Sequence, residues 1–257
     1  MILKGKNIII AGGTSGIGLA AVHFFLNEGA NIVSIGKNNE ETLPRATANL
    51  QWVFGDLRKE ETIQQAIKVC IEHYRTIDGL LHVAGGSGRT FGDGPLHLLT
   101  EEGWEKTWQL NATSTMLSNR AIINVMLHHQ HAGSIVNISS VLASHPSPHF
   151  FSTHAYAAAK AAIIGLSKSA AAFYAKNNIR INVISPGLVD TPMAARAKAN
   201  EEIMQFIQTK QPLDGGRISK AEDIVGMAAF LLSDQSKFIT GQEVAVDGGW
   251  SISDGQF

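Results

Sequence analysis

The feature that most constrains the fold is an apolar run that leads directly into a glycine turn and then an amphipathic segment. Residues 7–11 read Asn-Ile-Ile-Ile-Ala, residues 12–18 read Gly-Gly-Thr-Ser-Gly-Ile-Gly, and apolar residues then recur at helical spacing as far as Gly29. A run that is apolar at consecutive positions is typical of a strand buried on both faces, as in a parallel sheet covered by helices. The pattern therefore predicts the first strand and helix of a parallel α/β fold.

The glycines of this turn predict a phosphate-binding loop. Gly12 lets the chain turn tightly, Gly16 lets the backbone come close to a pyrophosphate, and Gly18 lets the helix pack closely on the sheet. Free N–H groups at the helix start attract phosphates. A plain tight turn would use the same residues, and the spacing is Gly-x-x-x-Gly-x-Gly rather than the commoner Gly-x-Gly-x-x-Gly. In this context we favour dinucleotide binding, through Gly12, Thr14, Ser15, Gly16, Ile17 and Gly18.

Apolar runs of strand length alternate with segments of helical periodicity along the rest of the chain. The expected strands are residues 7–11, 31–35, 51–54, 79–83, 134–138, 179–184 and 241–246. This alternation predicts one doubly wound, Rossmann-like domain over residues 1–257, with a seven-stranded parallel sheet and helices on both faces. One long helix is expected at about 100–127, and a looser loop or lid segment at about 188–212.

In such a sheet ligands bind beyond the carboxyl ends of the strands. The second strand ends in Gly36-Lys37, where an acidic residue would hold the ribose hydroxyls of NAD. A lysine there favours the 2′-phosphate of NADP, although a solvated loop lysine is also common. Asp56-Leu57 follows the third strand. The Asp56 carboxylate can accept a hydrogen bond from an adenine amine, or it can cap the next helix. Ala84-Gly85 after the fourth strand lets a cofactor ribose approach the backbone.

A second group of polar residues falls at the same edge of the sheet. Ser139-Ser140 follows the fifth strand and Pro186–Thr191 follows the sixth. Tyr156 and Lys160 are four residues apart in a segment predicted to be helical, so the phenol and the ammonium share one face. An ordinary exposed helix turn would show the same pair. Because the pair is expected to lie near the residues that follow the strands, we favour a functional site.

Composition and charge exclude several other classes. The formal net charge of −1 gives no reason to expect a nucleic-acid or anionic-membrane partner. The single Cys70 rules out an intrachain disulfide, and its amphipathic setting favours a core residue over a nucleophile. His128, His129 and His131 lack the spacing of a tetrahedral metal site, so we expect no metal. Because no signal-peptide pattern or membrane-spanning run is present, we expect a cytoplasmic protein.

Taken together, the motifs resemble those of the classical short-chain dehydrogenases/reductases over nearly the whole chain. The resemblance rests on Gly12-x-x-x-Gly16-Ile17-Gly18, Ala84-Gly85, Asn111, Ser139-Ser140, Tyr156-x-x-x-Lys160, Pro186-Gly187, Thr191 and Val246-Asp247-Gly248-Gly249. It implies an NAD(P)-dependent oxidoreductase that interconverts a secondary alcohol and a ketone. It also implies a homo-oligomer, a tetramer or dimer, in which the helices bearing Asn111 and Tyr156 pair across an interface.

The resemblance also implies a role for each matching residue. Tyr156 is the general acid/base, and Lys160 places a cation beside it and holds the nicotinamide ribose. Ser140, preferred over Ser139, orients the carbonyl, and Asn111 supports a water in a proton relay. The residues implied to hold the nicotinamide carboxamide are Pro186, Gly187, Val189 and Thr191.

Departures from the family pattern affect the substrate most. Ala11 stands where the family usually has threonine, His82-Val83 replaces two asparagines, and the stretch from Ser140 to Tyr156 is longer than usual. A longer loop reshapes the pocket wall, so no particular substrate is implied. The residues expected to contact substrate are Ser140, Leu142, His149, Phe151, Leu188 and Met193. For His149 we favour a plain surface position over a substrate contact.

Two alternative functions remain open. One is a dinucleotide-binding sensor or regulatory protein without turnover, which would need none of Asn111, Ser140, Tyr156 and Lys160. The other is an epimerase or dehydratase that uses the same cofactor in a different reaction.

Overall fold

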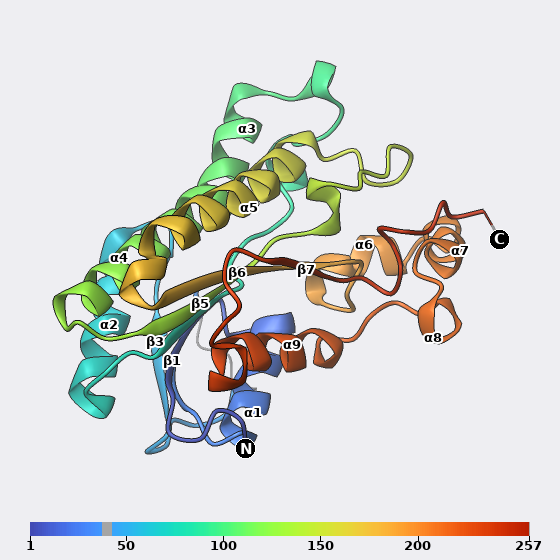
Figure 1. Ribbon diagram of the computed structural model, residues 1–257. Coiled ribbons are helices and arrows are strands. Elements are labelled where there is room, and N and C mark those ends of the chain that lie inside the picture. The colour runs from blue at the N-terminus through green and yellow to red at the C-terminus, as the bar shows by residue number, and fades with distance from the viewer. Residues whose placement is uncertain (38–42, 257) are drawn as a thin grey trace.

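The computed structural model describes residues 1–37 and 43–256, and a seven-stranded sheet runs through its centre (Figure 1). All strand pairs are parallel, in the order β3-β2-β1-β4-β5-β6-β7. The strands are β1 (Asn7–Ala11), β2 (Asn31–Gly36), β3 (Leu50–Phe54), β4 (Gly79–His82), β5 (Gly133–Ile138), β6 (Ile179–Pro186) and β7 (Glu243–Val246). The predicted doubly wound fold is confirmed, and the strand order reverses between β1 and β4, where such folds bind ligands.

Helices cover both faces of the sheet, with α2, α4 and α5 on one side and α1 and α9 on the other (Figure 1). Their bounds are α1 (Gly16–Asn27), α2 (Glu60–Tyr74), α3 (Glu101–Trp108), α4 (Ser114–His128), α5 (His154–Tyr174), α6 (Ala195–Lys198), α7 (Glu201–Lys210), α8 (Leu213–Gly216) and α9 (Glu222–Leu232). Alternate side chains of a strand point to opposite faces, so Ile8 and Ile10 pack toward α1 and α9 while Ile9 packs toward α2 and α4. This explains the uninterrupted apolar run.

The long helix expected at about 100–127 is present over residues 101–128, but its α-helical geometry is interrupted near the middle. A π-helical turn, Gln109–Thr113, separates α3 from α4. The Asn111 Nδ2 donates to the Thr107 carbonyl at 2.8 Å, while the Asn111 carbonyl accepts the hydroxyls of Ser114 and Thr115 at 3.1 and 2.8 Å. Side-chain groups thus engage the backbone throughout this turn. Single π-turns inside helices occur frequently at functional sites.

The segment at about 188–212 is largely helical, and it contains the 3-10 turn Pro192–Ala194, α6 and α7. Ala197, Ile203 and Ile207 pack with Val141 and Trp250 in a small apolar cluster separate from the two sheet faces. In Figure 1 this part of the chain extends beyond the sheet, near the C-terminus. Within residues 1–37 and 43–256, no helix has the length and apolarity that a membrane crossing requires.

Candidate active site

A cavity of about 900 Å³ lies along the carboxyl ends of the strands. Its walls come from the turn between β1 and α1, the ends of β2 to β6, the start of α5 and the segment around α6. The residues singled out by sequence that line it are Gly12, Thr14, Ser15, Gly16, Ile17, Lys37, Asp56, Leu57, Ala84, Gly85, Ser139, Ser140, Leu142, Phe151, Tyr156, Lys160, Pro186, Gly187, Leu188, Val189, Thr191 and Met193. Three others, Gly18, Asn111 and His149, lie outside the lining.

The glycine turn has the geometry that a pyrophosphate requires. Gly12 and Gly16 have φ values of +97° and +51°, in the left-handed region that favours glycine. A Cβ on Gly18 would stand 1.9 Å from the Gly12 carbonyl oxygen, so the helix can pack this closely only with glycine there. The Ser15 side chain makes no capping bond within the described part of the chain, which leaves amides at the start of α1 available to an anion. The turn therefore fits a dinucleotide phosphate group.

The end of the cavity beside β2 and β3 carries positive charge. Lys37 and Arg58 both line it, on either side of Asp56 in the chain. The Arg58 Nε donates to both Asp56 carboxylate oxygens at 2.9 and 3.0 Å. These hydrogen bonds, with the charges of Arg58 and Lys37, lower the pKa of Asp56 to about 2. Arg58 was missed by the sequence analysis, because an arginine two residues after an aspartate carries no distinctive pattern.

The Thr14 side chain packs closely against Gly36 at the end of β2. A Cβ added there would stand 2.0 Å from the Thr14 Cγ2 and 2.5 Å from its Oγ1. The Thr14 side chain thus occupies the space in which an acidic side chain at position 36 would begin.

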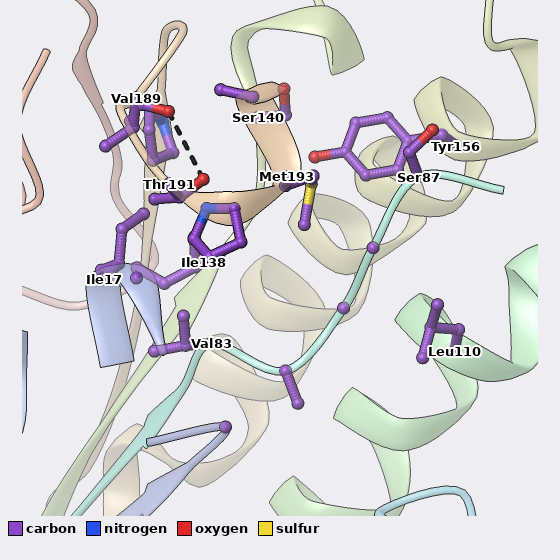
Figure 2. A pocket seen from close by; sticks show the side chains of 18 of the residues that line it. Ile17, Val83, Ser87, Leu110, Ile138, Ser140, Tyr156, Val189, Thr191 and Met193 are labelled. Atoms are coloured by element: carbon purple, nitrogen blue, oxygen red, sulfur yellow. Dashed lines mark hydrogen bonds between the residues drawn. The ribbon is translucent and has the colours of Figure 1, made fainter. Parts of the chain in front are cut away.

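Tyr156 stands in the first turn of α5 beside Ser140, and both side chains reach the same part of the cavity (Figure 2). Burial raises the pKa of the Tyr156 phenol, while a hydrogen bond with Ser140 acts in the opposite direction. The Ser140 Oγ also accepts the Leu142 amide at 3.2 Å. Ser139 differs, because its hydroxyl donates to the Lys160 carbonyl at 2.9 Å and so connects the end of β5 to α5.

Lys160 lies one turn further along α5 and is only 3 % exposed. Its Nζ donates to the Ile138 carbonyl at 2.9 Å and stands 5.6 Å from the centroid of the Tyr156 ring. Burial lowers the pKa of this ammonium to about 8. The phenol and the cation thus share one face of α5.

Asn111 lies behind the cavity wall rather than in it. Its Oδ1 accepts the Gly86 amide at 3.1 Å, and its Nδ2 donates to the Gly86 carbonyl at 3.0 Å. A Cβ on Gly85 would stand 2.6 Å from the Asn111 Oδ1 and 3.2 Å from the Lys160 Nζ. Asn111 and Lys160 therefore converge on Gly85, and Asn111 reaches this point from within the π-turn.

The segment after β6 forms the opposite wall of the cavity. The Thr191 hydroxyl donates to the Val189 carbonyl at 3.4 Å, as the dashed line in Figure 2 marks. A Cβ on Gly16 would stand 2.9 Å from the Thr191 Cγ2, so the glycine turn and this wall are in close contact. Gln211, fully buried, donates to and accepts from the backbone of Leu188 and fixes its position.

The wall near Ser140 is mostly apolar, with Leu142, Phe151, Leu188 and Met193 in the lining. His149 is exposed instead and packs edge-on against Phe150 with ring centroids 4.5 Å apart. Lining residues that the sequence analysis did not single out include Arg89, Arg196 and Trp250. Among residues 1–37 and 43–256, no group of three or more histidine, cysteine, aspartate or glutamate residues could hold a metal ion.

Asp93 is a further residue that sequence reasoning missed. Its buried carboxylate accepts the backbone amides of Ala155 and Tyr156 at 3.0 and 2.9 Å. The residue directly before α5, Thr153, makes no capping bond with its side chain in the described structure. A loop far away in the sequence therefore caps the helix that bears the phenol, and no local pattern marks it.

The parallel sheet and its cavity define a Rossmann-like protein, and comparisons with known proteins identify the family. The family described as "Enoyl-(Acyl carrier protein) reductase" matches residues 11–251. The chain is 32 % identical to a 3-oxoacyl-(acyl-carrier-protein) reductase of Thermotoga maritima, over 98 % of this chain and 100 % of the relative. It is 33 % identical to dehydrogenase/reductase SDR family member 6 of Xenopus laevis, over 97 % of this chain and 99 % of the relative.

Solved structures agree with this assignment. A short-chain type dehydrogenase/reductase from Mycobacterium ulcerans superposes with a TM-score of 0.88 at 29 % identity, covering 98 % of this chain and 92 % of that one. A 4-hydroxyisoleucine dehydrogenase complexed with NADH superposes with a TM-score of 0.84 at 30 % identity, covering 96 % and 98 %. The chain belongs to the classical short-chain dehydrogenase/reductase family. Membership implies an oxidoreductase with a nicotinamide dinucleotide cofactor.

Proposed function

We propose that the protein is an NADP(H)-dependent oxidoreductase that interconverts a secondary alcohol and a ketone, with Tyr156 as general acid/base. The observation that carries the proposal is the placement of the Tyr156 phenol beside the Ser140 hydroxyl, on the same helix face as the Lys160 ammonium. All three line the cavity that also contains the glycine turn. A sensor would need the turn but not this proton-transfer group.

The cofactor would lie along the cavity, with its pyrophosphate at the amides that follow Ser15 and its adenosine toward Lys37 and Asp56. Thr191 and the backbone of Val189 would hold the nicotinamide end. When bound, the nicotinamide supplies or accepts the hydride. The protein's contribution is to position it against the phenol and to exclude water from the reacting atoms.

In the reduction direction the Tyr156 Oη donates its proton to the carbonyl oxygen of the substrate. The raised pKa keeps this phenol protonated at neutral pH, which suits it to act as the acid. The Ser140 hydroxyl donates a hydrogen bond to the same oxygen, where negative charge develops. The positive charge of Lys160 stabilises the phenolate that remains, and Asn111 supports proton return on the far side of Gly85.

NADP(H) is proposed over NAD(H) because Lys37 lines the adenosine end beside the Arg58–Asp56 ion pair, and Thr14 fills the space that an acidic residue at position 36 would need. Fluorescence titration with NADPH and NADH tests this choice, and tighter binding of NADH would reject it. The solved relative complexed with NADH is a reason to measure both cofactors.

Two further features belong to the same proposal. The segment at about 188–212 would act as a lid, because it lines the cavity at Leu188 and Met193, and its helices α6 and α7 pack in the small cluster with Val141 and Trp250 rather than on the sheet. The protein would form a dimer or tetramer through α4 and α5, which lie side by side on one face of the sheet (Figure 1). Phe173, 63 % exposed near the end of α5, supports this interface. Light scattering that shows a monomer would contradict it.

Steady-state NADPH oxidation with a panel of ketones tests the central proposal. Wild-type protein is compared with Tyr156→Phe, which keeps the ring but removes the acidic proton, and with Ser140→Ala. We expect kcat to fall about 100-fold or more in the phenylalanine variant, the scale of general acid catalysis, with NADPH affinity retained. A phenylalanine variant as active as wild type would overturn the role of Tyr156. Tight NADPH binding without turnover of any ketone or alcohol would favour the sensor.

A further inference from the structure

Two arginine side chains from distant parts of the chain meet on the substrate side of the cavity. Arg89 begins a 3-10 turn after β4, and Arg196 belongs to α6. Their Nη2 atoms donate to the same acceptor, the Phe150 carbonyl, at 3.4 and 3.1 Å. Both line the cavity that contains Tyr156, and the Arg196 guanidinium stands 6.0 Å from the centroid of the Phe151 ring, which also lines it.

These two cations have no acidic partner of their own. Within residues 1–37 and 43–256, neither guanidinium forms a salt bridge. Asp93 contributes a favourable charge to Arg89, but both of its carboxylate oxygens already accept amides of α5. Partial burial lowers the pKa of Arg89, and the like charge of Arg196 lowers it further. The two guanidinium groups thus carry two positive charges against the single charge of Asp93, which leaves this part of the cavity lining with net positive charge.

Most donors of the two guanidinium groups remain available to a ligand. Each guanidinium has five N–H donors in a planar fork. In the described structure each makes a single side-chain hydrogen bond, to the Phe150 carbonyl. That shared carbonyl holds the two forks near each other without neutralising them. Such an arrangement suits an anion with planar oxygens, which arginine binds through two parallel hydrogen bonds.

We propose that Arg89 and Arg196 form an anion subsite and that the substrate is an oxo acid, or the corresponding hydroxy acid, whose carboxylate binds there. This inference rests on the proposed function, because it places the carbonyl of the same molecule at Tyr156. The apolar side chains of Leu142 and Met193 line the cavity as well, so the carbon chain between carboxylate and carbonyl is hydrocarbon.

The kinetic test compares oxo acids of increasing chain length with their methyl esters, which keep the ketone and lose the charge. We expect kcat/KM for the best acid to exceed that of its ester by about 10- to 100-fold, the effect of a charge-assisted hydrogen bond. Arg89→Gln and Arg196→Gln each reduce this ratio, mainly through KM for the acid, and the lysine variants restore part of it. Lys198→Gln is the matched control, because it removes a cation from α6 that pairs with Asp190 and does not line the cavity. An acid-to-ester ratio near one in wild type would overturn the inference.

A binding test separates failure of this inference from failure of the proposed function. Valerate, valeramide and butyl phosphate are titrated calorimetrically into wild-type protein loaded with NADPH. Binding of valerate but not valeramide, lost in Arg89→Gln/Arg196→Gln, supports the carboxylate subsite even if no ketone is reduced. Turnover of neutral ketones that depends on Tyr156, without any preference for carboxylates, supports the proposed function and rejects the subsite. Tighter binding of butyl phosphate would reject a carboxylate substrate in favour of a phosphorylated one.

The same variants test whether the arginines serve the cofactor instead. If Arg89→Gln and Arg196→Gln weaken NADPH binding as strongly as valerate binding, the pair contacts the cofactor phosphates and the substrate assignment is wrong. We expect the dissociation constant of NADPH to change less than twofold, well below the effect of a lost charge-assisted bond.

Discussion

The carboxylate of Asp93 accepts a hydrogen bond from the backbone amide of Tyr156 over 2.9 Å, and so holds the first turn of α5 from a loop after β4. The same carboxylate accepts the amide of Ala155 at 3.0 Å. Two of the free amides of α5 are satisfied in this way, and a negative charge lies at the positive end of the helix. The position of the phenol relative to Ser140 therefore depends on a residue that does not line the cavity.

Replacement of Asp93 by alanine should lower both stability and turnover. Loss of a helix cap costs about 1 to 2 kcal/mol of unfolding free energy, and freedom of the first turn should lower kcat more than it weakens NADPH binding. Urea unfolding and steady-state kinetics measure the two effects. Thr153→Ala is the control for stability alone, because this buried residue precedes α5 and lines the cavity but its side chain does not cap the helix. Equal losses of unfolding free energy in the two variants would show that the Asp93 cap has no special role.

The elements that sequence predicted well are those fixed by local patterns. The run Ile8–Ile10 indicates a buried parallel strand, and the turn Gly12–Gly18 needs glycine for steric reasons that any such turn shares. Tyr156 and Lys160 share a helix face because of helical geometry alone. These features follow from residues a few positions apart, so the chain itself encodes them.

The features that sequence did not predict depend on partners far along the chain. Asp93 and Gln211 act on backbone groups of distant segments, and a pattern of neighbours carries no information about such contacts. The π-turn at Asn111 was also missed. Asparagine and threonine are only moderate helix formers, and the hydrophobic pattern of an α-helix, which repeats every 3.6 residues, does not reveal the single extra residue of a π-turn. Arg89 and Arg196 look like ordinary surface cations until the fold brings them together.

His82 should make the protein sensitive to acid. Burial, with the nearby charge of Lys160, lowers the pKa of this histidine to about 3, and its Nδ1 has no hydrogen-bond partner in the described structure. An unfolded histidine takes up a proton below about pH 6.5, whereas His82 in the folded protein does not. As pH falls below 6.5 the unfolded state therefore binds more protons and stability falls, by about 1.4 kcal/mol per pH unit once the unfolded histidine is protonated.

Comparison with His82→Asn isolates this effect, because asparagine does not titrate. Between about pH 7 and pH 4.5, wild type should lose about 2 to 3 kcal/mol more unfolding free energy than the variant. Urea unfolding at the two pH values gives the loss of unfolding free energy in each protein. The contributions of the other titrating groups are the same in both proteins and cancel in the comparison. Parallel losses in both proteins would mean that His82 takes up a proton as readily in the folded protein as in the unfolded chain.

Lys160 should act in the alkaline range. Burial lowers its pKa from 10.5 to about 8. At neutral pH the charged ammonium is therefore less favourable in the folded protein than in the unfolded chain, and this difference costs stability. This cost is fully present below about pH 8 and disappears as pH rises through the unfolded pKa near 10.5. Lys160→Met removes the charge. The stability of the variant relative to wild type should therefore fall by about 2 kcal/mol between about pH 7 and pH 10.

The Lys160→Met variant should also be almost inactive at both pH values, since it no longer stabilises the phenolate of Tyr156. A stability difference that does not change with pH would show that the ammonium is better hydrated than its 3 % exposure indicates. Activity and stability are thus opposed at this residue, as expected for a buried charge kept for function.

The contact between Thr14 and Gly36 predicts how cofactor choice can be reversed. An aspartate at position 36 would hold the ribose hydroxyls of NADH and repel the 2′-phosphate of NADPH. In the present structure its Cβ would stand 2.0 Å from the Thr14 Cγ2, so Gly36→Asp alone should weaken both cofactors. Thr14→Gly/Gly36→Asp removes the obstruction, and we expect NADH to bind about tenfold or more tightly than NADPH in the double variant.

Thr14→Gly alone is the matched control for this reversal. It should weaken the binding of both cofactors to a similar degree and leave the proposed preference for NADPH in place, because Lys37 still lines the cavity beside β2. Fluorescence titration of the four proteins gives a complete cycle, and the coupling between the two substitutions measures the steric conflict directly. If Gly36→Asp alone binds NADH well, then Thr14 moves aside at little cost. In that case the lack of an acidic residue at the end of β2 serves only to accommodate the 2′-phosphate of NADPH. The packing of Thr14 then has no part in the choice between NADPH and NADH.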